Sequence, residues 1–412
     1  MIKLKNNFHF IEIPNLKFNS NVIQISFFAN LSEINQAARY LLSKIMENGF
    51  GTYSKMKDVT RALDEMYGAN LKIDSYISGS ISEFNFKISF IDSKLIHDDN
   101  LTKKIILFIR EAIFQPFFNE TIFLIEKDNL INEYNSVLDD KTKFAAKKIE
   151  EEYFSNSEMK QSSLGRIEDI QNLSLKDVED AYKHLLENEF SLIFYFGNEN
   201  IIDMFELFDK ASDTLLGDVA YKQKLHNFKQ TTIVDTVEQT TFMQMYNVSN
   251  FEINLKSRAK LSLFSAILGG TNNSLLFTNI REKQSLAYSV ASWPSVLNGT
   301  LTIYAGIEEK NINKVQQTIN EEIQIILNEK YDNELLDFTK TILVNSLLKE
   351  EDSISMLVSR MIQSQLLKQE YSVNDYIEEI KKITKKDLAE FTANNIFLQN
   401  QLILIPRDDR GV

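Results

Sequence analysis

The chain repeats one pattern of residues after about 210 positions. Residues 177–195 (DVEDAYKHLLENEFSLIFY) and residues 387–405 (DLAEFTANNIFLQNQLILI) each begin at an acidic residue, continue with helical spacing and end in a short apolar strand. Aligned without gaps, Asp177 corresponds to Asp387. Unrelated helices would not keep both order and spacing, so we predict two tandem copies of one domain.

The predicted strands and helices come in the same order in both copies. Strand patterns come first, then helices, then a final strand, which predicts the α+β class: a mostly antiparallel sheet with helices packed on one face. We expect a first domain over 1–210, a linker over 211–231 and a second domain over 232–412. In the first domain, one long helix is expected over 119–155, beginning at Asn119.

Composition limits the kinds of partner. The chain has 58 acidic and 45 basic residues, a net charge of −13 and no visible basic patch, so binding to nucleic acid is disfavoured. No window approaches the roughly 18 apolar residues that a membrane span needs, and the start of the chain has no apolar stretch of signal length. We therefore expect a soluble, cytoplasmic protein that has no membrane partner.

Residues for a self-sufficient active site are missing. The sequence has no cysteine, and its histidines are not within helical ligand spacing of one another; they are His9, His97, His184 and His226. It contains no phosphate loop, no dinucleotide-binding glycine pattern and no nucleophile-elbow serine. We expect no cofactor in this chain and no catalytic centre formed by this chain alone.

One segment of the second copy does carry a specific motif. The run LGGTNN (268–273) is followed by LLFTNIREKQSLAYSV (275–290), and a strand pattern ending in IYAG comes next. This order resembles the C-terminal half of the pitrilysin, or insulinase-like, zinc peptidases, a family that includes the mitochondrial processing peptidases. The typical sequence of this family is close to SRLFxxIREKxGLAYSV, and the present chain has Ser285 where that sequence has its glycine. Together with the repeat, the resemblance covers nearly the whole chain.

The zinc motif of that family is absent. The family carries H-x-x-E-H on the first long helix of its first domain, and the aligned positions here are Arg39, Leu42 and Ser43. Leu42 belongs to the apolar stripe of this helix and should face the core. The third zinc ligand of the family, a glutamate on a later helix, matches Glu133, with Glu126 two turns earlier. Both glutamates could instead be ordinary solvated helix charges.

The second copy keeps the residues that the family uses to contact substrate. By the resemblance, Arg281 would hydrogen-bond a substrate carbonyl and Tyr288 would donate to the oxyanion of the tetrahedral intermediate, near a loop formed by Gly269, Gly270, Thr271 and Asn272. Simpler explanations exist for several of these residues.

An arginine at a helix end interacts favourably with the helix dipole. Tyr288 alternates with Leu286 and Val290, as a core tyrosine would. The two glycines could simply end a helix.

The resemblance also implies a partner. Some relatives divide the work between two chains, one with the zinc motif and one with only the arginine and tyrosine. The present chain looks like the metal-free member, so we expect a heterodimer with a homologous chain that carries H-x-x-E-H and zinc and acts on peptides. The alternative is an inactive structural or peptide-binding scaffold of the same fold, like the core subunits of the respiratory bc complex.

Overall fold

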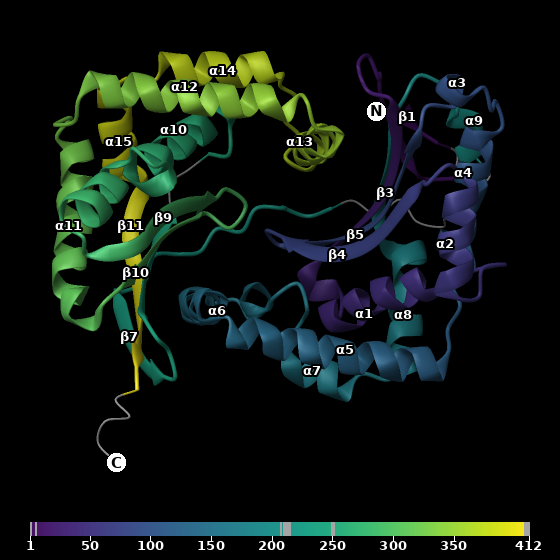
Figure 1. The fold of residues 1–412 in the computed structure, drawn as a ribbon, viewed down its shortest axis with the longest axis horizontal. Helices are drawn as coiled ribbons and strands as arrows, with labels where there is room; N and C mark the ends of the chain where they lie inside the picture. The colour runs from purple at the N-terminus through teal and green to yellow at the C-terminus, as the bar shows by residue number, and fades with distance from the viewer. Residues whose placement is uncertain (1, 5, 207, 209–215, 249–251, 408–412) are drawn as a thin grey trace. The chain divides into compact units, whose positions relative to one another are not determined.

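The computed structural model describes residues 1–412 except 1, 5, 207, 209–215, 249–251 and 408–412. The described residues form two compact units. The first comprises 1–136 and 161–219, and the second comprises 137–160 and 220–412. Each unit contains one sheet with associated helices (Figure 1).

The first unit is built on a mixed sheet in the order β1-β2-β6-β3-β5-β4. Only β6 with β2 is a parallel pair, and the other pairings are antiparallel. Its strands are β1 (Ile2–Lys3), β2 (His9–Ile13), β3 (Ser20–Asn30), β4 (Asn70–Ser78), β5 (Ile81–Ile91) and β6 (Phe190–Phe196). Its helices are α1 (Gln36–Asn48), α2 (Met56–Glu65), α3 (Ser93–Ile96), α4 (Leu101–Phe114), α5 (Glu120–Asp139), α7 (Ile167–Asn172), α8 (Leu175–Asn188) and α9 (Ile202–Phe205).

The second unit repeats this topology with the order β7-β11-β8-β10-β9. Again one pair is parallel, β11 with β7. Its strands are β7 (Lys229–Asp235), β8 (Thr240–Val248), β9 (Ala287–Ser295), β10 (Thr300–Ile307) and β11 (Ile396–Pro406). Its helices are α6 (Lys141–Tyr153), α10 (Leu255–Ser265), two π-helices (Ala266–Gly270 and Phe277–Lys283), α11 (Ile312–Leu327), α12 (Asn333–Glu350), α13 (Ile354–Leu366), α14 (Val373–Lys382) and α15 (Lys385–Asn395).

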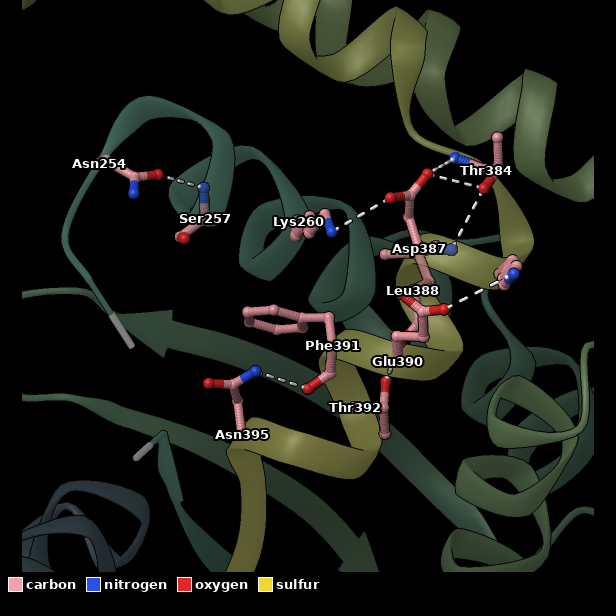
Figure 2. A network of polar contacts seen from close by, with 11 residues as sticks. Asn254, Ser257, Lys260, Thr384, Asp387, Leu388, Glu390, Phe391, Thr392 and Asn395 are labelled. Carbon is pink, nitrogen blue, oxygen red and sulfur yellow. Dashed lines mark hydrogen bonds and ion pairs between the residues drawn. The ribbon is translucent and has the colours of Figure 1, made fainter. Parts of the chain in front are cut away.

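Equivalent residues of the two units make the same local contacts, which confirms the predicted repeat. In both units, the helix directly before the last strand begins with a capping box. The box is formed by Ser174 and Asp177 in the helix before β6, and by Thr384 and Asp387 in the helix before β11. Figure 2 shows the second box, in which Asp387 also forms an ion pair with Lys260 of α10 at 3.2 Å. A capping box satisfies two backbone N–H groups at a helix start. The predicted α+β fold with two homologous domains is therefore confirmed.

The predicted helix over 119–155 is two helices. Asn119 does cap its start, because its Oδ1 accepts from the N–H of Thr121 at 2.8 Å. The helix then ends at Asp139, and Asp140 caps α6 by accepting from the N–H groups of Thr142 and Lys143. A short acidic side chain favours a helix N-cap over a helix interior, which explains the break. After the break, α6 packs on β8 and β11 of the second unit.

The start of the second sheet was not expected from the sequence. The predicted linker, 211–231, lies partly outside the described residues, and its last residues belong to β7, which pairs with β11. The boundaries of the two homologous halves, 1–210 and 232–412, stay a prediction. Within the described residues, no helix is both long enough and apolar enough to cross a membrane.

Candidate functional site

The segment that carries the motif is built from π-helices. α10 continues as the π-helix Ala266–Gly270, and the π-helix Phe277–Lys283 leads into β9. The second π-helix is fixed to α11 because Asn279 donates to Glu322 at 2.7 Å. Burial raises the pKa of Glu322, although the Asn279 hydrogen bond opposes this shift. Such π-helical turns are rare and are frequent at functional sites.

The glycine loop packs closely against β9. A Cβ atom on Gly269 would lie 3.0 Å from the backbone nitrogen of Ser292 and 3.1 Å from its Oγ, so only glycine fits here without a shift. Gly270 and Asn272 are exposed, and the Thr271 hydroxyl donates to the carbonyl of Ala266 at 3.3 Å. Gly269 therefore has a clear packing role, while contact of these four residues with substrate stays a prediction.

Ser285 adopts the left-handed backbone conformation. Its φ is 48°, in the region that glycine enters without steric cost and other residues rarely occupy. The Leu286 N–H donates to the carbonyl of Ile280 at 2.8 Å and closes the turn from the π-helix into β9. The turn thus keeps the shape that the glycine of the family motif would favour, although the residue is serine.

Tyr288 is the extra residue of a β-bulge. In the pairing of β10 with β9, Gly306 lies opposite Ser289 and Ile307 lies opposite Ala287, so Tyr288 has no partner. Bulges change the direction of a side chain and occur often beside active sites. Tyr288 is 68% exposed, whereas Ala287 and Val290 are buried. The interpretation of Tyr288 as a buried core residue is therefore wrong.

Arg281 is also exposed. It lies near the end of the second π-helix, with its guanidinium 4.7 Å from the centre of the Phe277 ring. Within the described parts of the chain, no carboxylate forms an ion pair with it, so its hydrogen-bond donors remain available. Arg281 and Lys283 both lie in the last turn of this helix, where a cation also interacts favourably with the helix dipole.

Sequence reasoning missed two charged residues beside Tyr288. The Lys310 ammonium donates to Glu308 at 2.6 Å, and this hydrogen bond raises the pKa of Lys310. The side-chain amide of Asn311, the residue after Lys310, donates to the carbonyl of Leu286 at 3.3 Å, which holds this turn beside the start of β9, where Tyr288 lies. Lys310 and Glu308 follow β10 in the sequence and lie outside the motif, so only the packing of the sheet indicates that they are near Tyr288.

The positions aligned with the zinc motif are buried in the first unit. Leu42 and Ser43 are fully buried, and the Ser43 hydroxyl donates to the carbonyl of Tyr40 at 2.7 Å. Arg39 is 2% exposed and forms an ion pair with the buried Glu189. Among the residues that the structure describes, no three His, Asp or Glu side chains gather where they could hold a metal ion.

The two glutamates on α5 have partners on α1. Glu133 accepts a hydrogen bond from the Tyr40 hydroxyl at 2.8 Å, and Glu126 accepts one from the Asn48 side chain at 2.9 Å. Burial and the neighbouring Glu133 together raise the pKa of Tyr40. Glu133 is exposed and Glu126 is half-buried, and each also accepts a hydrogen bond that joins α5 to α1.

Comparison with known proteins shows which proteins the chain is similar to. Residues 172–343 match the family described as the Peptidase M16 inactive domain. The chain is similar to M16 peptidases over this segment. It is 23% identical over 385 residues to the "Probable inactive metalloprotease YmfF" of Bacillus subtilis (strain 168), covering 91% of this chain and 90% of that protein. It is 31% identical over 179 residues to an "Uncharacterized zinc protease" of Rickettsia felis, covering 42% of this chain and 43% of that protein.

Solved structures are similar to this chain in fold. A crystal structure of a conserved protein from Enterococcus faecalis V583 matches with a TM-score of 0.91 and 24% identity, over 97% of this chain and 96% of that chain. At this identity the likeness concerns the fold. The chain is thus a metalloprotease-like protein, similar to M16 peptidases, that has two tandem domains and no H-x-x-E-H motif.

Proposed function

We propose that this chain is the non-zinc subunit of a heterodimeric zinc endopeptidase. In this proposal, a homologous YmfH-like chain supplies the H-x-x-E-H motif and the zinc, and Arg281 and Tyr288 contact the peptide substrate. The bulge that exposes Tyr288 carries the proposal, because a tyrosine kept only for packing would not be 68% exposed on an edge strand. The match to YmfF, a relative described as an inactive metalloprotease, supports the assignment to a metal-free role.

Each of the two residues would act through hydrogen bonds. Arg281 offers a rigid fork of N–H donors to a substrate carbonyl, and Tyr288 offers one O–H donor to the oxyanion that develops as the peptide bond is attacked. Preorganised donors of this kind often contribute about 10²–10³ in rate. The partner's zinc would activate the attacking water, since neither side chain can do so.

The test uses the full chain mixed with its zinc-motif partner. The rate of cleavage of an unstructured peptide is measured for the native mixture and for mixtures containing Arg281→Ala or Tyr288→Phe. We expect each substitution to lower kcat by about 10²–10³ while the complex still forms, as measured by size-exclusion chromatography. Lys283→Ala is the matched control, because it removes a neighbouring exposed cation from the same π-helix.

Two results would contradict the proposal. Unchanged rates with both variants in an assembled complex would remove the assigned roles of Arg281 and Tyr288. A complex that forms and binds peptide without cleaving it would favour the alternative of an inactive scaffold.

The chain purified alone is expected to hydrolyse no peptide and to bind no stoichiometric zinc, which metal analysis after dialysis would measure.

A further inference from the structure

A pocket of about 550 Å³ opens in the second unit, away from Tyr288. It lies where β8 ends and β9 turns into β10, whereas Tyr288 is near the first residue of β9. Strand β9 has 9 residues, so the two places are separated by roughly 27 Å along the strand. The pocket is therefore distinct from the candidate site around Arg281 and Tyr288.

Backbone hydrogen bonds hold the walls of this pocket. The N–H of Tyr221 donates to the carbonyl of Leu297 at 2.7 Å, which ties the segment before β7 to the hairpin turn. The N–H of Val248 donates to the carbonyl of Gly299 at 2.8 Å, which ties the end of β8 to the same turn. Main-chain hydrogen bonds therefore fix both walls, and largely preformed walls are usual for small-molecule sites.

The rim of the pocket is positively charged. Lys222 and Lys224 line it, one on each side of the buried Gln223 in the sequence. Both are exposed, and neither forms an ion pair within the part of the chain that the structure describes. The single acidic residue of the lining is Glu252. In a chain of net charge −13, such a rim favours an anionic ligand.

The interior combines apolar surface with one unsatisfied acceptor. Val248, Ile253 and Val296 supply the apolar surface. Asn247 is 2% exposed, and its Nδ2 donates to the Tyr153 hydroxyl at 2.7 Å and to the Gln223 carbonyl at 2.9 Å.

The Gln223 carbonyl can only accept, so the amide of Asn247 cannot be turned around. Its Oδ1 has no hydrogen-bond partner among the described residues. A buried acceptor without a hydrogen bond costs free energy, so a ligand that donates to this oxygen would be favoured.

We propose that this pocket binds the C-terminal end of a short apolar peptide. The terminal carboxylate pairs with Lys222 and Lys224, and the terminal side chain packs on Val248, Ile253 and Val296. The amide N–H of the terminal residue is the donor for Asn247. This proposal does not depend on the proposed peptidase role, since it uses none of the same residues.

The experiment titrates the full chain, without a partner, by isothermal titration calorimetry. The probe is acetyl-Leu-Phe with a free carboxylate, and its C-terminal amide and decanoate are compared with it. We expect the free acid to bind at least tenfold more tightly than either comparison ligand. The double variant Lys222→Gln/Lys224→Gln should weaken binding of the acid at least tenfold. Lys256→Gln, which alters an exposed lysine of α10, should leave binding unchanged.

Three outcomes would overturn this assignment. Equal binding of the acid and its amide would show that the carboxylate is not recognised. Equal binding of decanoate and the acid would show that the peptide N–H is not recognised. Unchanged binding by the double lysine variant, with native circular dichroism, would place the ligand elsewhere. Because none of the altered residues belongs to the proposed peptidase site, failure here leaves the proposed function intact.

Discussion

The buried ion pair between Arg39 and Glu189 should make the first unit sensitive to the loss of either partner alone. The two side chains are 2% and 1% exposed, and Arg39 also donates to the Phe27 carbonyl at 3.0 Å. Burial alone would raise the pKa of Glu189, but the charge of Arg39 and hydrogen bonds from Arg39 and His184 hold it below its usual value. The Glu189 carboxylate therefore stays ionised in the interior, where the charge of Arg39 stabilises it.

Removing one partner leaves the other charge buried. We expect Glu189→Leu or Arg39→Met to lower the free energy of unfolding of the first unit by about 3–5 kcal/mol. The double variant Arg39→Met/Glu189→Leu should lie within about 2 kcal/mol of the native protein, because two apolar residues of similar size replace the pair. The double-mutant cycle therefore isolates the cost of an unpaired buried charge.

The single tryptophan allows the two units to be followed separately. Trp293 lies on β9 of the second unit, so its fluorescence reports that unit, whereas far-UV circular dichroism reports both. In urea, with a slope of about 2–3 kcal/mol/M, each single variant should lower the midpoint of the first unit by about 1–2.5 M. A loss below about 1 kcal/mol, or an equal shift of the Trp293 transition, would refute the reasoning.

Three further predictions concern the second unit. Hydrogen bonds from Thr384, and the ion pair with Lys260, lower the pKa of Asp387 from 3.8 to about 2. A lowered pKa stabilises the fold above pH 3.8 and loses this effect as pH falls towards 2. Asp387→Asn should therefore cost about 1–2 kcal/mol at pH 7, after allowance for partial exposure, and the cost should shrink in thermal unfolding between pH 4 and 2; a pH-independent cost would contradict it. Ser285→Gly should stabilise the unit by about 0.5–1 kcal/mol, because glycine removes the left-handed strain, and a lower urea midpoint of Trp293 fluorescence would count against this. Gly269→Ala should cost about 1–3 kcal/mol by contact with Ser292, and an unchanged midpoint would mean that β9 can move away.

Much of the fold was predictable because its signals are local. The capping residues at Asp177 and Asp387 repeat in the sequence and begin equivalent helices in the structure. The absence of the zinc motif is evident from the sequence itself. The burial of Leu42 confirms the apolar stripe expected for its helix. The break at Asp140 was missed because helical spacing continues across it, although its acidic side chain was a usable signal.

The candidate site was predictable in its residues but not in its geometry. The family motif identified Arg281 and Tyr288, yet strict alternation placed Tyr288 in the core. A bulge is a property of two paired strands, so the sequence of β9 alone does not contain it. For the same reason, nothing in the motif pointed to Lys310, which the neighbouring strand and its following turn bring near Tyr288.

The sequence by itself determined the duplicated α+β architecture, the helix starts and the absence of a zinc motif, since periodicity and capping act over a few residues. Tertiary structure decided which side chains face the solvent and which are paired. It set the outward direction of Tyr288, the packing of α6 on the second sheet and the pairing of Arg39 with a glutamate 150 positions away. These features depend on strand register and long-range packing, which arise only when distant segments meet.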